Sequence, residues 1–148
     1  MSEEREAAEE LAPRSAAAML ERDAATRGVG MTVEEVRSGY ARLRMRVRDD
    51  MLNGHGTCHG GYVFMLADSA FAFACNSRDR ATVAAGAAIE FLAPGRAGDV
   101  LVAEAQEQAL GGRLGVYDVV VRREPGGERI ALFRGRSYGL GAPVIRDT

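Results

Sequence analysis

The stretch Tyr62-Val-Phe-Met-Leu-Ala-Asp-Ser-Ala-Phe-Ala-Phe-Ala-Cys75 decides how this sequence folds, because it is apolar at almost every position. A segment of this length that is apolar all round is typical of a helix buried within a domain. The two glycines Gly60 and Gly61 stand just before it. The sequence therefore predicts one long helix that the rest of the chain encloses.

The chain on both sides of this helix predicts strands. Residues 31–47 alternate between polar and apolar side chains around Ser38-Gly39, which predicts two strands joined by a turn. Downstream we expect further strands, with glycine-rich turns between them, over 81–92, 99–109, 114–123 and 129–140. This order predicts an α+β fold in which a curled antiparallel sheet of five or six strands wraps around one central helix.

The N-terminal part of the chain predicts a leading helix. Apolar residues recur at helical spacing from Leu11 to Thr26, and Pro13 fits the first turn. The Glu- and Ala-rich residues before Leu11 are expected to fray, so residues 1–12 are interpreted as a mobile extension. A length of 148 residues predicts a single domain over residues 1–148.

Composition excludes several classes of function. A net charge of −2 gives no reason to expect a nucleic-acid partner, and all 19 basic residues are Arg. We expect no membrane span, since no uninterrupted apolar stretch reaches about 18 residues, and the acidic N-terminus does not resemble a signal peptide. If Cys58 and Cys75 lie on one helical segment, about 25 Å separates them, too far for a disulfide. We therefore expect a cytoplasmic protein.

Asp68 is the only charged residue between Gly60 and Asn76. A carboxylate inside an apolar helix is unfavourable by several kcal/mol, or takes up a proton, unless something compensates it. Two interpretations follow: Asp68 lies on a wet edge of the helix, or it is kept at a ligand cleft as a base or nucleophile.

The residues just before the helix offer polar groups of their own. The N–H groups of Gly60 and Gly61 lie at the positive end of the helix dipole, where they can bind an anion or polarise a carbonyl. The alternative is that these glycines only shape the turn into the helix. Asn53 can orient a water or a carbonyl, or can serve as an ordinary turn residue.

The spacing of Gly60 and Asp68 limits how they can cooperate. Eight helical residues span about 12 Å, so one substrate carbonyl cannot touch both on the same helix. Two copies of the helix packed antiparallel across a two-fold axis would bring Gly60 of one chain to Asp68 of the other. If both residues act on one carbonyl, the active unit is a dimer.

Metal binding and thiol catalysis are both disfavoured. His55, Cys58 and His59 are possible ligands, but no second cluster follows at zinc spacing, so no metal is predicted. A Cys–His nucleophilic pair would need a third group to orient it, and adjacent residues rarely aim their side chains at each other.

Three runs of sequence together resemble a known family: Asn53-Gly-His-Gly-Thr-Cys-His-Gly-Gly61, Leu66-Ala-Asp-Ser-Ala-Phe-Ala72 and Ile89-Glu-Phe-Leu-Ala-Pro-Gly-Arg-Ala-Gly-Asp99. They are similar to the hotdog-fold acyl-CoA thioesterases of phenylacetic acid degradation, and the resemblance spans about residues 31–140. It implies that Asp68 is the catalytic carboxylate, that Gly60 donates its N–H to the thioester carbonyl, and that Asn53 positions substrate or water. His59 and Gly61, beside that donor, are expected to bind substrate.

The same resemblance implies an aryl-acetyl-CoA substrate, such as phenylacetyl-CoA or its hydroxylated relatives, and no cofactor. It further implies a homotetramer, a dimer of dimers with sites at the helix–helix interface. Two alternatives stay open: a hotdog dehydratase or hydratase acting on acyl-CoA, and a non-catalytic acyl-CoA-binding module.

One departure from the family pattern matters. Related thioesterases often have Ser or Thr one turn after the acid or on the following strand, where this chain has Ala72 and Ala84. Ser69 and Thr82 lie nearby without an assigned role. Exposed arginines suit the CoA phosphates, but the candidates are more simply interpreted as solvated surface charge: Arg78, Arg80 and Arg96.

Overall fold

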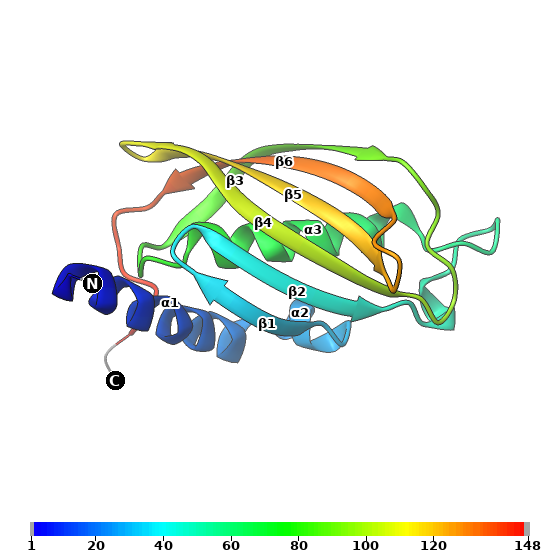
Figure 1. Cartoon of the computed structure of the whole chain (residues 1–148), viewed down its shortest axis with the longest axis horizontal. Coiled ribbons are helices and arrows are strands. Elements are labelled where there is room, and N and C mark those ends of the chain that lie inside the picture. Colours follow the sequence, from blue (N-terminus) through cyan, green and yellow to red (C-terminus); the bar gives the residue numbers. More distant parts are fainter. Residues whose placement is uncertain (1, 147–148) are drawn as a thin grey trace.

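The computed structural model describes residues 2–146. One helix, α3 (Gly60–Cys75), lies at the centre of the fold, and the other elements surround it. Six antiparallel strands form one sheet in the order β1-β2-β4-β5-β6-β3. The sheet curls around α3, as Figure 1 shows. This is the hotdog arrangement, so the predicted α+β fold with a sheet wrapped around one helix is confirmed.

The six strands lie close to their predicted positions. Their bounds are β1 Thr32–Arg37, β2 Tyr40–Arg46, β3 Thr82–Phe91, β4 Val100–Gly111, β5 Leu114–Glu124 and β6 Arg129–Gly139. Burial along β5 alternates with period two, as expected for a strand with one face on a core. The turn between β1 and β2 contains Gly39 at a φ of 74°, a left-handed conformation that glycine adopts without strain.

The leading helix is longer than predicted. It runs as α1 (Glu3–Arg22), and a short α2 (Ala24–Gly28) follows it. Ser2 caps α1 by accepting the N–H of Arg5, and three glutamates in the first turn suit the positive end of the helix dipole. The placement of Pro13 in a first turn was therefore wrong, since Pro13 lies inside the helix. Mobility of residues 1–12 stays a prediction.

Phe71, on α3, lies at the centre of the hydrophobic core between this helix and the sheet. Its ring packs edge-on against Tyr117 at 5.5 Å and lies 5.9 Å from the ring of Phe133. A Cβ on Gly135 would lie 2.7 Å from the Phe71 ring, so β6 can approach α3 here only with glycine. The helix and the inner face of the sheet therefore interlock around one aromatic side chain.

Asn76 ties the end of α3 to the start of β3. Its amide nitrogen donates to the carbonyls of Ala72 and Thr82, each at 2.9 Å, and its amide oxygen accepts the N–H of Thr82 at 2.8 Å. Asn76 is only 5% exposed, so these hydrogen bonds are shielded from water. The C-terminal end of α3 is held rigidly beside β3.

The two edges of the sheet differ. The β1 edge is covered by α1, which lies along it in Figure 1 and buries Ala12 and Ala16. The β3 edge has no neighbouring strand among residues 2–146, and its apolar residues are largely exposed, with Val83 at 46% and Phe91 at 55%. β3 is therefore an open apolar edge.

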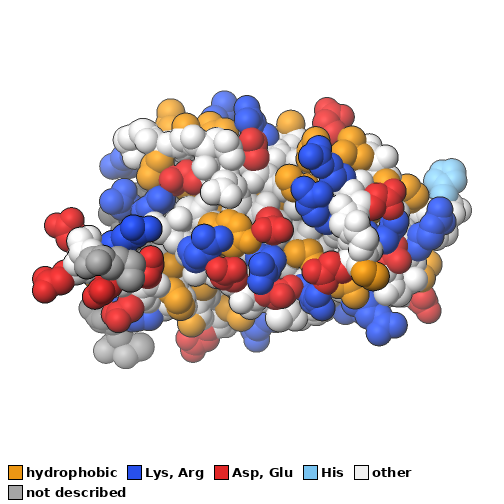
Figure 2. Space-filling model, in the orientation of Figure 1, with side chains coloured by type: hydrophobic (Ala, Val, Ile, Leu, Met, Phe, Trp, Pro, Cys, Tyr) orange, Lys and Arg blue, Asp and Glu red, His pale blue; other side chains and the backbone are white. Residues whose placement is uncertain are grey.

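The surface over β1, β2 and β4 mixes charges of both signs, as Figure 2 shows. Arg42 and Arg44 pair with Glu34, and Arg44 also pairs with Glu124. Opposite charges at this spacing largely cancel each other's field on this face. In the part of the chain that the structure describes, no helix has both the length and the apolar character needed to cross a membrane.

Candidate active site

The first turn of α3 leaves one backbone donor open. Gly60 is the first residue of the helix rather than part of the loop, and His59 is its N-cap. His59 Nδ1 accepts the N–H of Gly61 at 2.8 Å, so in the neutral ring the proton lies on Nε2. Within residues 2–146 the N–H of Gly60 makes no hydrogen bond. The structure therefore separates the two glycines: the Gly61 N–H is occupied, and the Gly60 N–H is available.

The space around Gly60 suits a close approach by a ligand. A Cβ here would lie 3.0 Å from Cζ of Phe91, whose exposed ring sits at the end of β3. Gly60 lines a cavity of about 420 Å³ together with Asn53, Val63 and Phe91. A glycine at the first helical position thus keeps both the backbone N–H and this cavity accessible.

Asn53 organises the loop that precedes α3. Its side-chain oxygen accepts the N–H groups of His55 at 2.9 Å and Thr57 at 3.2 Å, and its amide nitrogen donates to the Thr57 hydroxyl at 3.1 Å. This Asx-type arrangement supports the interpretation of Asn53 as a turn residue. One N–H of the amide remains without a partner in these contacts, so the catalytic role predicted for Asn53 stays a prediction.

Asp68 lies on the side of α3 that the sheet does not fully cover. It is half-buried, and no hydrogen bond or ion pair to its carboxylate is found among the described residues. Burial raises the pKa of the Asp68 carboxyl above its ordinary value. A carboxyl group with no stabilising partner is prepared to take up a proton, as a general base must.

The neighbours of Asp68 form a stripe along α3. Gly61, Met65, Asp68 and Ala72 follow each other at helical spacing, and all four are at least partly exposed. We call these four residues the open stripe. Gly60 and Asp68 are both on α3, so the rise of the helix places them about 12 Å apart, and one protomer alone does not bring them to one carbonyl.

The alternatives based on cysteine and on metals find no support in the geometry. Cys58 precedes α3, so its predicted place on the helix was wrong; both cysteines are free and buried. Burial raises the pKa of Cys58 to about 11 and that of Cys75 to about 12, which keeps both thiols protonated at neutral pH. No cluster of three or more His, Cys, Asp or Glu side chains suited to a metal is present within residues 2–146.

The hydroxyl and cationic groups left unassigned by the sequence now have places. Ser69 is buried and bonds to the Thr26 hydroxyl at 3.0 Å, so it anchors α2 to α3 instead of facing the site. Arg78 forms two hydrogen bonds, of 2.6 and 2.9 Å, with Glu107. This pairing makes Arg78 a structural residue, whereas Arg80 and Arg96 are exposed.

The sequence did not predict the contact between Gly60 and Phe91. No local signal was available, because the two residues are far apart in the chain and only the closure of β3 beside α3 brings them together. The apolar Phe91-Leu92 pair just before Pro94 was the one hint, since it ends a strand with large exposed side chains.

Comparison with known proteins now decides the family. The model of the thioesterase superfamily matches residues 55–130, which include the first turn of α3, Asp68 and β3. The chain belongs to the thioesterase superfamily. It is therefore a thioester hydrolase, and the hydratase and pure binding alternatives are set aside.

Relatives with similar sequences support the assignment of this chain to the thioesterases. It is 44% identical to the acyl-coenzyme A thioesterase PaaI of Escherichia coli (strain K12) over 133 residues, which are 90% of this chain and 94% of PaaI. It is 41% identical to a putative esterase of Deinococcus radiodurans, covering 72% of this chain and 73% of the relative.

Solved structures agree with the fold of this thioesterase. The E. coli PaaI protein from the phenylacetic acid degradation operon superposes with a TM-score of 0.90 and 43% identity, covering 92% of this chain and 98% of that one. A mutant of the phenylacetic acid degradation protein PaaI of Thermus thermophilus gives 0.74 and 38%, covering 78% and 97%. The resemblance drawn from the sequence is confirmed.

Proposed function

We propose that this thioesterase hydrolyses aryl-acetyl-CoA thioesters, phenylacetyl-CoA and its hydroxylated relatives, to the free acid and CoA in phenylacetate catabolism. The observation that carries the chemistry is that α3 presents two groups without hydrogen-bond partners among the described residues, the carboxyl of Asp68 and the N–H of Gly60. The similarity to the acyl-coenzyme A thioesterase PaaI over 90% of the chain supports an acyl-CoA substrate, and the origin of E. coli PaaI in the phenylacetic acid degradation operon supports the aryl-acetyl group. Free, buried cysteines suit the reducing cytoplasm, where we place the protein.

In the proposed reaction the Gly60 N–H donates to the thioester oxygen as negative charge develops there, aided by the dipole of α3. Asp68 either removes a proton from the attacking water or attacks the carbonyl carbon itself. In the second route the intermediate is a mixed anhydride, which water then cleaves. Both routes release the CoA thiolate, which takes up a proton.

The supporting residues act on the first turn of α3. His59 fixes this turn through Gly61 and presents its Nε2–H towards solvent, where it suits a carbonyl of the CoA arm. We assign Gly61 to the same substrate-binding wall, since it is exposed at the start of the open stripe. Asn53 sets the course of the loop, and its remaining N–H is directed to substrate or water.

The site is proposed to form between two protomers. Within one chain Gly60 and Asp68 stay about 12 Å apart. If two α3 helices pack antiparallel, Gly60 of the partner subunit faces Asp68, and both groups can reach one carbonyl. The open stripe, which is apolar apart from Asp68, and the exposed apolar edge of β3 are surfaces that such a partner would bury. A row of exposed apolar residues on the outer face of the sheet, Val83, Tyr138 and Leu114, offers a second surface for a dimer of dimers.

The first test is the Asp68→Ala variant, assayed with phenylacetyl-CoA by thiol release. We expect turnover to fall by about three orders of magnitude or more, with the oligomer intact by size-exclusion chromatography. Near-normal turnover would overturn the role of Asp68. Single-turnover hydrolysis in ¹⁸O-labelled water separates the two routes, because only the nucleophile route leaves label in the Asp68 carboxylate.

The second test asks whether the site is shared between chains. Asp68→Asn and Gly60→Pro protomers, each inactive alone, are co-expressed with different tags, and the hybrid dimer is purified through both tags. One of its two sites carries both defects and the other is intact, so the hybrid should regain about half of wild-type activity. A hybrid that regains nothing would place both residues of each site on one chain.

A further inference from the structure

The exposed ring of Phe91, the last residue of β3, lies against the first residue of α3. A Cβ on Gly60 would be 3.0 Å from Cζ, 3.3 Å from Cε1 and 3.6 Å from Cε2 of Phe91. These three atoms form the far edge of the ring, so this edge points at Gly60. Apart from the chain neighbours of Gly60, no other side chain among residues 2–146 comes closer to this position.

Backbone hydrogen bonds fix both sides of this contact. The residue after Phe91 donates its N–H to the carbonyl of Ile130 at 2.9 Å, which holds the end of β3 against β6. The N–H of Cys58, two residues before Gly60, donates to the carbonyl of Gly95 at 2.8 Å. The loop before α3 and the segment after β3 are therefore tied together, and the place of the ring beside Gly60 is part of the fold.

The residue under this ring edge carries a free donor. Within residues 2–146 the N–H of Gly60 makes no hydrogen bond, and the proposed reaction assigns it to the thioester oxygen. Exposed apolar side chains are common and mean little by themselves. Here, however, the ring of Phe91 covers one side of a residue whose N–H lacks an acceptor, and it keeps water from that side.

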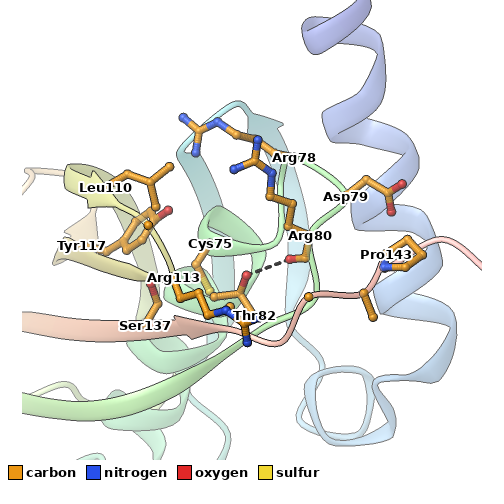
Figure 3. Close-up of a pocket in the computed structure, with 14 residues that line it drawn as sticks. Cys75, Arg78, Asp79, Arg80, Thr82, Leu110, Arg113, Tyr117, Ser137 and Pro143 are labelled. Atoms are coloured by element: carbon orange, nitrogen blue, oxygen red, sulfur yellow. Dashed lines mark hydrogen bonds between the residues drawn. The ribbon is translucent and has the colours of Figure 1, made fainter.

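The cavity at the other end of α3 differs in this respect. It has a volume of about 340 Å³ and is drawn in Figure 3. Two of its hydroxyl groups are already bonded: that of Tyr117 donates to Glu107 at 2.9 Å, and that of Thr82 donates to the carbonyl of Arg80 at 2.7 Å. The free donor beside Phe91 is instead a backbone N–H, which no side-chain rotation can turn away.

We propose that Phe91 is a positioning residue of the thioester hydrolysis, whose ring shields the Gly60 N–H from water and leaves this donor open only to the thioester oxygen. The inference rests on the proposed function, because it takes the Gly60 N–H as the donor to that oxygen. Where water is excluded, a fixed donor stabilises developing negative charge more strongly. Because the charge develops in the transition state, Phe91 should act on kcat more than on KM.

The first test measures kcat and KM for phenylacetyl-CoA by thiol release in the wild type, Phe91→Ala and Phe91→Leu. Phe91→Ala should lower kcat by about 10-fold and change KM by less than about 2-fold. Phe91→Leu keeps an apolar side chain beside Gly60, so its kcat should stay within about 3-fold of the wild type. Thermal melting checks that both variants are folded.

The second test repeats Phe91→Ala in the Gly60→Ala and Gly60→Pro backgrounds. Both backgrounds place a Cβ against the ring, but only proline removes the N–H. Relief of the steric contact, and any change in folding or assembly, therefore contributes alike to both. If the ring acts through the N–H, Phe91→Ala should lower kcat by about 10-fold more in the alanine background than in the proline background.

Leu110→Ala is the matched control. Leu110 is also a large exposed side chain near the end of a strand, but it lines the cavity of Figure 3. Its substitution should change kcat by the same factor in the two Gly60 backgrounds.

Three outcomes would overturn the inference alone: an equal effect of Phe91→Ala in both backgrounds, a loss confined to KM, or a loss in Phe91→Leu as large as that in Phe91→Ala. Absence of thiol release from phenylacetyl-CoA by the wild type would overturn the proposed function, and the inference with it.

Discussion

The two sides of α3 differ in burial and in how far their polar groups find partners within the chain. On the inner side, residues such as Leu66 and Ala70 are fully buried, and Phe71 is locked between Tyr117, Phe133 and Gly135. On the other side, the open stripe is partly exposed, and Asp68 has no partner among the described residues. The inner side is complete within one chain, whereas the open stripe presents groups that a substrate or a second protomer would complete.

The contrast explains why one helix can serve both stability and chemistry. An unpartnered carboxyl and an unpartnered N–H both oppose folding. The close-packed inner side offsets that cost, because burial of large apolar side chains is the main favourable contribution in a domain of this size. Mutations on the inner side should therefore change mainly the free energy of unfolding, and mutations on the open side should change mainly the catalytic activity.

Phe71→Ala should give the largest effect on the inner side. It removes an aromatic ring from a site that is 1% exposed, so we expect a loss of about 3–5 kcal/mol in the free energy of unfolding. Urea unfolding followed by circular dichroism measures it. A loss below about 1 kcal/mol would mean that the core refills the space and is less closely packed than described.

Gly60→Pro should lower catalytic activity, with an effect slightly smaller in free energy than that of Phe71→Ala on stability. It removes the N–H that we assign to the thioester oxygen, and proline is tolerated at the first position of a helix. We expect kcat to fall by about 10²- to 10³-fold, as for the loss of one oxyanion donor.

Gly60→Ala is the control for that variant, since it adds the same Cβ against Phe91 but keeps the N–H. The ratio between the alanine and proline variants isolates the hydrogen bond from the steric contact. Equal losses in both would remove the Gly60 N–H from the mechanism.

The pH dependence of kcat/KM tests the ionisation of Asp68. Burial raises the pKa of this carboxyl, and the proposed chemistry needs its charged form. Activity should therefore rise with pH through an apparent pKa above the ordinary Asp value of about 3.9. A profile that stays flat down to about pH 4 would contradict the raised pKa.

Asp68→Asn should give the smallest effect, a gain in stability at neutral pH. A carboxyl whose pKa is raised by folding binds its proton more tightly in the folded state, so the wild type loses stability as pH rises above the unfolded-state pKa. The variant escapes this loss, and its advantage should disappear below about pH 3.9. Because the carboxyl is half-exposed, we expect less than about 1 kcal/mol from thermal melts across this pH range.

Much of the inner side could be predicted from the sequence, because its signals are local. Alternation marked the strands, glycines marked the turns, and an apolar run marked α3. The start of α1 was misplaced, because the acidic residues before Leu11 also belong to the helix, where they complement its dipole.

The site was predictable only in part. Asp68 stood out as a lone charge in an apolar run, and Gly60 by its place before the helix. The direction of each side chain was not available: Ser69 faces Thr26, and the oxygen of Asn53 is used within its own loop.

The open edge of β3 affects how the newly synthesised chain avoids aggregation. An exposed apolar strand is a template for aggregation, and assembly with a second copy would protect it by mass action, so that stability rises with protein concentration. The strand itself, Thr-Val-Ala-Ala-Gly-Ala-Ala-Ile-Glu-Phe, is rich in Ala and Gly, which have low β-propensity. Such a strand is a weak seed for fibrils, and its pairing with a second copy would depend on a shape-matched contact. The composition of β3 would thereby favour assembly with a second copy of this chain over unspecific polymer growth.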